Sequence, residues 1–330
     1  MVRASGIGSM PGDDAAAYDE AVRIVLGEVP ELPHLPELPG RGAHANMTGR
    51  ALAVVAELGA DLQPAGWRLT DASGVDHRRA RSLLAQDLDA VEEQAQGFEG
   101  TFKIQVAGPW TLAATVERPR GDRVLADHGA RRELAQGLAE GLRAHVADVR
   151  RRLPAAEIVV QVDEPALPDV LAGRVPTSSG FSRHRSVDAQ GASPALEWVF
   201  AAIEDAGATS VAHCCAPQAP VGLLTGAGAA GISVDLTVLA VEAYDALAEV
   251  LEKHAPTYLG VVPAVEPAQP PSERSLIERV LRLLDMLGLD PGEVGDQLVV
   301  TPTCGLAGAS PAWASRALGL AHAIAANLSS

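Results

Sequence analysis

Histidine and cysteine residues with the spacing of metal ligands stand at two places in the chain. His213 and Cys215 stand at the end of an apolar run with one residue between them, and Cys304 follows another such run. Because side chains alternate along a strand, His213 and Cys215 are expected on one face, whereas Cys214 points to the other. Asp235 ends a third run. We therefore treat these strand ends as one candidate site and expect a structural role in the core for Cys214.

Two thiolates, an imidazole and a carboxylate are a ligand set that suits Zn²⁺, which accepts sulfur, nitrogen and oxygen donors in a tetrahedral arrangement. The predicted ligands are His213, Cys215, Asp235 and Cys304. Taken singly, each residue has another interpretation, because cysteines are often buried in cores and an aspartate after a strand can cap a helix. The common position of all four residues at the ends of predicted strands favours a shared metal site over separate structural roles.

The elements that would position these residues follow from the alternation of short apolar runs with longer stretches of helical period. Eight runs are predicted as strands, at 3–8, 31–37, 102–107, 157–163, 208–213, 230–235, 257–262 and 297–302. The alternation predicts an α/β fold with a parallel sheet, and eight strands favour a (β/α)₈ TIM barrel formed by residues 1–330 as one domain. In such a barrel the carboxyl ends of all strands meet at one face, where active sites lie.

Two further segments have a clear pattern. Residues 122–153 are predicted as a long helix, because leucines and valines recur every three or four residues and Pro154 ends the pattern. Residues 173–194 are polar and rich in Gly and Ser, which predicts a loop. This loop follows the fourth predicted strand, so a mobile lid over the site and an ordinary surface excursion are both open interpretations.

Composition limits the class of protein. The chain has 330 residues, 47% of them hydrophobic, and a net charge of −16. Such a charge excludes the broad basic face that nucleic acids require, so we expect a small-molecule substrate. No run approaches the roughly 18 apolar residues of a membrane span, and three cysteines make no disulfide framework. We expect a cytoplasmic protein that binds neither nucleic acid nor membrane.

Further motifs carry a family resemblance. They are Gly-Ile-Gly-Ser-Met-Pro at 6–11, Ala-Gly-Pro-Trp-Thr at 107–111 and Gln-Val-Asp-Glu-Pro-Ala-Leu at 161–167. With His213-x-Cys215 and Cys304-Gly-Leu they stand in the order of the C-terminal catalytic barrel of cobalamin-independent methionine synthase, which the chain resembles over nearly its whole length. The resemblance implies a barrel of the uroporphyrinogen decarboxylase and methionine synthase type.

The resemblance also implies an activity, the transfer of a methyl group to the thiol of homocysteine to give methionine. It implies that Ile7 and Ser9 face homocysteine and that Asp163 binds its amino group. Chemistry agrees, because zinc favours the deprotonated sulfur that methyl transfer requires, and a carboxylate holds an ammonium by charge-assisted hydrogen bonds. A helix cap at Asp163 and a plain turn at residues 6–11 remain open interpretations.

Some positions depart from the family's pattern. Asp235 stands where the family has a glutamate ligand, and residues 260–267 hold no histidine, which the family places there to protonate the departing folate. Glu266 is a candidate proton donor if it is buried, and otherwise a solvated loop residue. The family's long members carry a further N-terminal barrel that contributes to binding folate, for which these 330 residues have no room. The expected donor is therefore methyltetrahydrofolate or a methylcorrinoid, the latter supplied by a corrinoid protein.

Two other functions stay open from the sequence. A related methyltransferase could act on another thiol, such as a coenzyme thiol, although an acceptor without an amine would leave Asp163 without a partner. A non-catalytic barrel could bind zinc or a thiol without turnover. A relative such as uroporphyrinogen decarboxylase needs no zinc cluster, so the metal motif argues against it.

His34 and Glu37 receive no predicted role, because the prolines around them obscure the local geometry.

Overall fold

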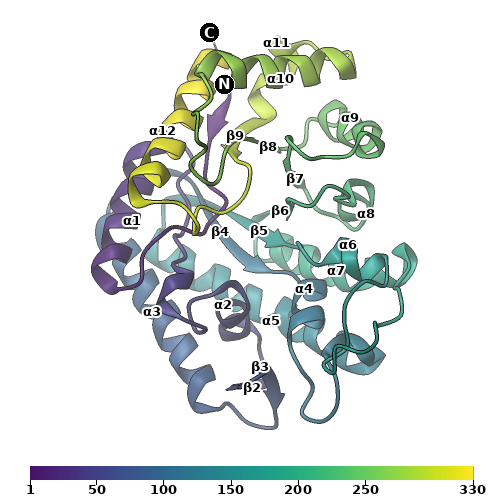
Figure 1. The fold of residues 1–330 in the computed structure, drawn as a ribbon. Coiled ribbons are helices and arrows are strands. Elements are labelled where there is room, and N and C mark those ends of the chain that lie inside the picture. Colours follow the sequence, from purple (N-terminus) through teal and green to yellow (C-terminus); the bar gives the residue numbers. More distant parts are fainter. Residues whose placement is uncertain (330) are drawn as a thin grey trace.

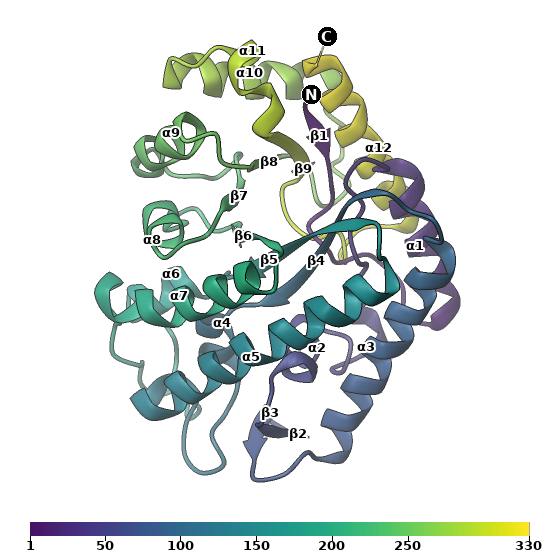
Figure 2. The same cartoon turned by 180° about the vertical axis from the view of Figure 1, so that it is seen from behind.

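A computed structural model describes residues 1–329 of the chain. At its centre is a curled, wholly parallel sheet of seven strands, with helices packed around the outside (Figures 1 and 2). In spatial order the strands are β1 (Arg3–Ala4), β9 (Leu298–Pro302), β8 (Thr257–Val262), β7 (Gly231–Asp235), β6 (Thr209–Cys214), β5 (Ala156–Asp163) and β4 (Gly100–Ala107). The predicted α/β class and parallel sheet are confirmed, and the fold is TIM-barrel-like.

The second predicted strand, 31–37, is not a regular strand. It lies between the end of β1 and β4, where the Leu35 amide donates to the Lys103 carbonyl at 2.8 Å and the Glu37 amide donates to the Gly8 carbonyl at 3.1 Å. Isolated parallel bridges replace a continuous ladder. The reason is local, because two prolines in the segment lack the N–H that a ladder needs.

Twelve α-helices lie within residues 1–329. They are α1 (Ala15–Glu28), α2 (Met47–Val54), α3 (Val75–Gln94), α4 (Pro109–Thr115), α5 (His128–Arg152), α6 (Leu167–Leu171), α7 (Ala189–Asp205), α8 (Val221–Gly226), α9 (Tyr244–Glu252), α10 (Glu273–Leu287), α11 (Pro291–Val294) and α12 (Pro311–Leu328). An antiparallel hairpin of β2 (Gly59–Gln63) and β3 (Gly66–Thr70), absent from the sequence-based expectation, stands apart from the main sheet. None of the helices in the described residues has the length and apolar character that crossing a membrane demands.

The predicted long helix, 122–153, begins later than expected. Helix α5 starts at His128, because the Asp127 carboxylate accepts a hydrogen bond from the Ala130 amide at 3.0 Å and caps the first turn. Residues ahead of this cap form a short 3₁₀ turn, Val124–Ala126, and a loop. The apolar stripe predicted for this helix is buried.

The predicted loop 173–194 is also shorter than expected. Residues 189–194 form the first turns of α7, where the Asp188 carboxylate accepts from the Gly191 amide at 2.7 Å. The remaining loop is fastened to a neighbouring one, since the amide and hydroxyl of Ser178 both donate to Asp122 Oδ1 at 2.8 Å. The lid function of this loop stays a prediction.

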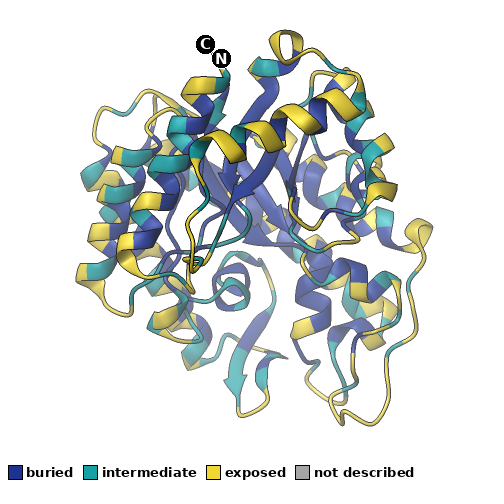
Figure 3. Cartoon of the chain, turned by 45° about the horizontal axis from the view of Figure 1, so that its top comes forward, coloured by how far each residue is buried: buried dark blue, intermediate teal, exposed yellow. Residues whose placement is uncertain are grey.

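The core has two parts. The main part packs the buried faces of the helices against the outward side of the sheet, and exposed residues lie on the outer faces of the helices (Figure 3). A separate cluster joins residues from β5, β6, β8, β9 and the segment after α1, which can meet only inside the curl of the sheet. Its members are Leu32, Val159, Val211, Tyr258 and Val299. The interior of the sheet is therefore filled at this level, and the site lies above it, at the carboxyl ends of the strands.

Candidate active site

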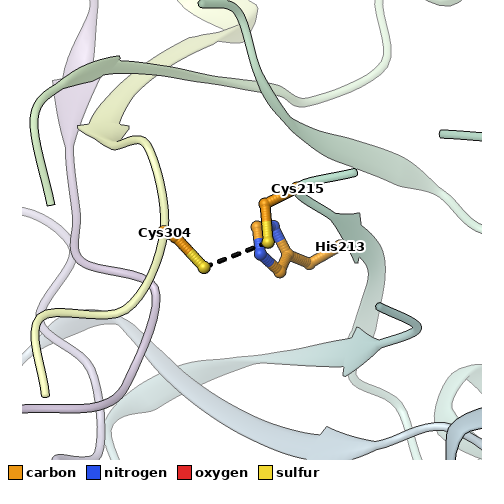
Figure 4. Close-up of side chains that lie close together, drawn as sticks. All are labelled: His213, Cys215 and Cys304. Carbon is orange, nitrogen blue, oxygen red and sulfur yellow. Dashed lines mark hydrogen bonds between the residues drawn. The ribbon is translucent and has the colours of Figure 1, made fainter. Parts of the chain in front are cut away.

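Three predicted metal ligands come together at the carboxyl ends of two strands. His213 lies in β6, Cys215 follows β6, and Cys304 follows β9. One ligand atom from each lies within 4.8 Å of the others, and the two sulfur atoms are 3.0 Å apart (Figure 4). Strands β7 and β8 separate β6 from β9 in the sheet, so its curvature is what makes the group compact.

The imidazole of His213 is oriented by a neighbouring strand. Ser233 lies beside it in β7, and its Oγ is 2.9 Å from Nδ1. With the hydroxyl accepting from Nδ1–H, the Nε2 atom carries the lone pair. Nε2 is buried and has no hydrogen-bond partner among the described residues. An unpartnered buried nitrogen facing two thiols fits the donor set of Zn²⁺.

The two site cysteines differ in their acidity. The hydrogen bond from the Cys215 thiol, with His213 close by, lowers the pKa of Cys304, so its sulfur takes the negative charge. By contrast, Cys214 is fully buried in the main core, and burial raises its pKa to about 12. Cys214 therefore has the environment of an inert structural thiol.

Two predicted site residues lie apart from this group. Asp235 ends β7, but its Oδ1 accepts from the amide and hydroxyl of Thr237 at 2.8 and 2.6 Å, and it is not in the ligand group found within residues 1–329. This oxygen of the carboxylate is therefore used in a local turn, and not in the group of predicted ligands. Glu266 is exposed in the loop after β8, so it lacks the burial on which the predicted role as a proton donor depended.

A cavity of about 340 Å³ opens beside the three ligands. Its wall includes Ile7, Ser9 and Asp163, the residues predicted to bind substrate, together with Glu37. A Cβ at Gly305 would lie 2.0 Å from the Ser9 Oγ, so a larger residue here would displace the Ser9 hydroxyl. The structure thus brings the predicted substrate-binding residues and three of the predicted metal ligands to one cavity.

Glu37, which received no role from the sequence, is held by buried donors. Its Oε1 accepts from Gln105 Nε2 at 2.9 Å and lies 3.3 Å from Arg50 Nε. Arg50 also forms an ion pair with the buried Asp87. Because the guanidinium contacts both carboxylates, Glu37 is fixed at the wall of the cavity as one of two acidic groups, with Asp163 as the other.

Asp163 rests on a buried polar chain. Its Oδ1 accepts from Gln161 Nε2 at 2.7 Å, and the Gln161 Oε1 accepts from Lys103 Nζ at 2.8 Å. Burial raises the pKa of Asp163 and lowers that of Lys103. A lysine within the apolar run of a predicted strand was the one sequence signal for this chain of contacts.

The neighbouring Glu164 has a structural role. Its carboxylate accepts from the amides of Trp110 and Thr111 at 2.9 and 2.7 Å and from the Thr111 hydroxyl at 2.7 Å. It therefore caps the first turn of α4, which lies far from it in the sequence. Burial raises the pKa of Glu164 to about 7.

Comparisons with known proteins agree with this arrangement. Residues 100–327 match the family described as "Cobalamin-independent synthase, Catalytic domain". A B12-independent methionine synthase from Shewanella sp. W3-18-1, solved with selenomethionine, is similar in fold with a TM-score of 0.65 at 13% identity, covering 99% of this chain and 98% of that one. At that identity the likeness shows the fold alone. No curated protein matches the chain by sequence.

Two other solved structures are more distant. A D-psicose 3-epimerase has a TM-score of 0.48 at 9% identity and covers 99% of both chains. A β-1,4-D-mannanase from Cryptopygus antarcticus has a TM-score of 0.49 at 11% identity, covering 97% of this chain and 90% of that one. Neither bears on the function.

Proposed function

We propose, from the premise that this chain belongs to the cobalamin-independent synthase catalytic-domain family, that it transfers a methyl group to the thiol of homocysteine and so forms methionine. The observation that carries the proposal is the unpartnered Nε2 of His213 facing the sulfur atoms of Cys215 and Cys304 at the wall of the cavity. These three residues are the proposed ligands of a catalytic zinc. Three protein ligands leave one position for the substrate sulfur.

A bound zinc ion would stabilise the substrate as a thiolate near neutral pH, which is the nucleophile that methyl transfer needs. The contribution of the protein is orientation. Ser233 holds His213 with Nε2 toward the two cysteines. Cys304 is the more readily deprotonated of the two cysteines, because its sulfur accepts a hydrogen bond from Cys215.

The amino-acid part of the substrate would bind at the acidic part of the cavity wall, where Asp163 lies on the strand next to His213. Asp163 and Glu37 present two carboxylates there, which suit an ammonium group. Ser9 is the proposed partner of the substrate carboxylate. The roles of Asp163, Ser9 and Ile7 in substrate binding rest on their place in the wall and on the motifs that contain them.

Methyltetrahydrofolate is the donor to test first. The family is described as cobalamin-independent, so membership gives no support to a corrinoid protein as a partner. Methylcobalamin remains the alternative donor in the same assay. We propose no proton donor, because Glu266 is exposed and outside the cavity wall.

We further propose that residues 1–330 form one (β/α)₈ barrel, in which the segment 33–37 takes the place of the eighth strand. Two parallel bridges support this, one between Ser9 and Glu37 and the other between His34 and Lys103. A cytoplasmic location is also proposed, since a reducing compartment would keep the three free cysteines available.

Zinc content tests the centre directly. We expect about one zinc per purified chain, and its loss from both Cys215→Ser and Cys304→Ser, by elemental analysis. Cys214→Ala is the matched control, because its buried sulfur faces the core and the variant should retain zinc. Asp235→Asn tests the predicted fourth ligand, and retention of zinc there would leave that carboxylate to its local turn. A parent chain that takes up no zinc would refute the proposal.

Turnover is then measured with the zinc-loaded protein, homocysteine and each methyl donor. We expect methionine to form, and Asp163→Asn to raise the KM for homocysteine more than it lowers kcat, because the carboxylate binds the unreacting amine. Preference for a thiol without an amine would indicate another acceptor. Zinc binding without turnover of any thiol would indicate a binding protein.

A further inference from the structure

Lys103 is fully buried inside the curled sheet, although the proposed chemistry gives it no task. It lies in β4 and has no exposed surface. Burying an amino group that can be charged is costly, and an apolar side chain of similar volume would commonly serve the core as well or better. Packing alone therefore does not explain a lysine at this position.

The contacts of Lys103 lead directly to the substrate cavity. Its Nζ donates to the Ile7 carbonyl at 2.9 Å and to Gln161 Oε1 at 2.8 Å. The amide nitrogen of Gln161 in turn donates to the same Ile7 carbonyl at 2.8 Å and to Asp163 Oδ1 at 2.7 Å. Ile7 and Asp163 both line the cavity, whereas Lys103 and Gln161 are not part of its wall. The lysine thus touches the site only through other groups.

Donor and acceptor chemistry makes this chain directional. Lysine can only donate and an ionised carboxylate can only accept, so the amide between them must turn its oxygen to Lys103 and its nitrogen to Asp163. The reversed amide would face the carboxylate with an oxygen and the lysine with a donor. The contacts at both ends therefore select one orientation of Gln161, and that orientation engages Oδ1 of Asp163.

We propose that Lys103 is a positioning residue for substrate recognition, which orients Gln161 so that Asp163 is held with one oxygen engaged and the other available to the substrate ammonium. The inference rests on the proposed function, since it assumes an acceptor that carries an amine. Lys103 therefore affects selectivity for the amine and has no contact with the reacting sulfur.

The test compares two thiols that differ only in the amine. Homocysteine and 4-mercaptobutyrate share the thiol, the chain length and the carboxylate. In the zinc-loaded parent we expect homocysteine to bind more tightly by calorimetry. Lys103→Met, close in shape but without donors, should weaken homocysteine binding roughly 10- to 100-fold, the range for losing a hydrogen bond to a charged group. Binding of 4-mercaptobutyrate and zinc content should change less than about twofold, because neither depends on Asp163.

Two further variants separate positioning from packing. Gln161→Met breaks the same chain at its middle, so it should reproduce the selective loss, and the double variant should be little worse than either single one. Thr301→Val is the matched control, since Thr301 is fully buried in β9 and its hydroxyl has no partner among the described residues. That control should keep the preference for homocysteine.

The outcomes are distinct. A parent that binds both thiols equally would overturn the proposed acceptor and this inference with it. A parent that prefers homocysteine, together with Lys103→Met and Gln161→Met variants that keep this preference, would overturn the role of Lys103 alone. Should Lys103→Met fail to fold, Gln161→Met decides the question, because it leaves the lysine in place. If the folded variants lose the same factor in affinity for both thiols, Lys103 has a role in packing and not in positioning Asp163.

Discussion

The hydrogen bond between Ser233 and His213 offers the sharpest test of the metal centre. In Ser233→Ala the 2.9 Å contact to Nδ1 is lost, while the zinc ligands themselves stay intact. Both side chains are buried, with exposed fractions of 0% and 3%, so water is a poor substitute for the hydroxyl. Removing such a support commonly costs 10- to 100-fold in metal affinity, or about 1.4 to 2.7 kcal/mol.

The assay is zinc competition with a chromogenic chelator at constant pH, on the parent and the variant. Ser210→Ala is the matched control, because Ser210 is also fully buried, and its Oγ accepts from the Ala230 amide at 3.0 Å, away from the ligands. We expect the control to lose about 1 kcal/mol of unfolding free energy and to keep the zinc affinity of the parent. Parent-like affinity in Ser233→Ala, or an equal loss in both variants, would refute the argument that this serine orients the imidazole.

Three other predictions follow from the contacts. Gly305→Ala would bring a Cβ to 2.0 Å from the Ser9 Oγ, so we expect a several-fold higher homocysteine Kd with zinc content unchanged. Glu164→Gln replaces an acceptor with a donor opposite the Thr111 amide and hydroxyl, and should lower the free energy of unfolding in urea by about 1 to 3 kcal/mol. Burial lowers the pKa of His34 well below its ordinary value, so the unfolded chain takes up a proton that the folded chain excludes. His34 should therefore contribute a fall of about 1 kcal/mol in unfolding free energy from pH 7.5 to 5.5, and His34→Gln should remove that contribution relative to the parent.

Much of the fold was predictable because buried parallel strands are short apolar runs. The predicted ranges 102–107, 157–163 and 257–262 agree with β4, β5 and β8 to within two residues at each end. Where prolines break the run, at 31–37, the pattern did not tell a strand from a segment held by single bridges. The β2 and β3 hairpin was missed, since its strands are only partly buried and so carry no continuous apolar run.

The common direction of His213 and Cys215 was predictable for a similarly local reason. A period of two puts His213 and Cys215 on one face of a strand, and this depends on no distant residue. The fate of Asp235 was not predictable in this way. A carboxylate at this position can bind a metal or accept a hydrogen bond from a nearby amide. The structure shows the second, with the amide of Thr237 as donor.

The sequence by itself determined which residues with chemical side chains stand at strand ends, because strand formation and side-chain alternation are local properties. Only the tertiary structure decided which of them share a cavity. Ser233 supports His213, and Lys103 reaches Asp163 through Gln161, because the register between neighbouring strands sets these pairs. Register results from packing over the whole sheet, so residues far apart in the chain acquire their roles only when the sheet has curled.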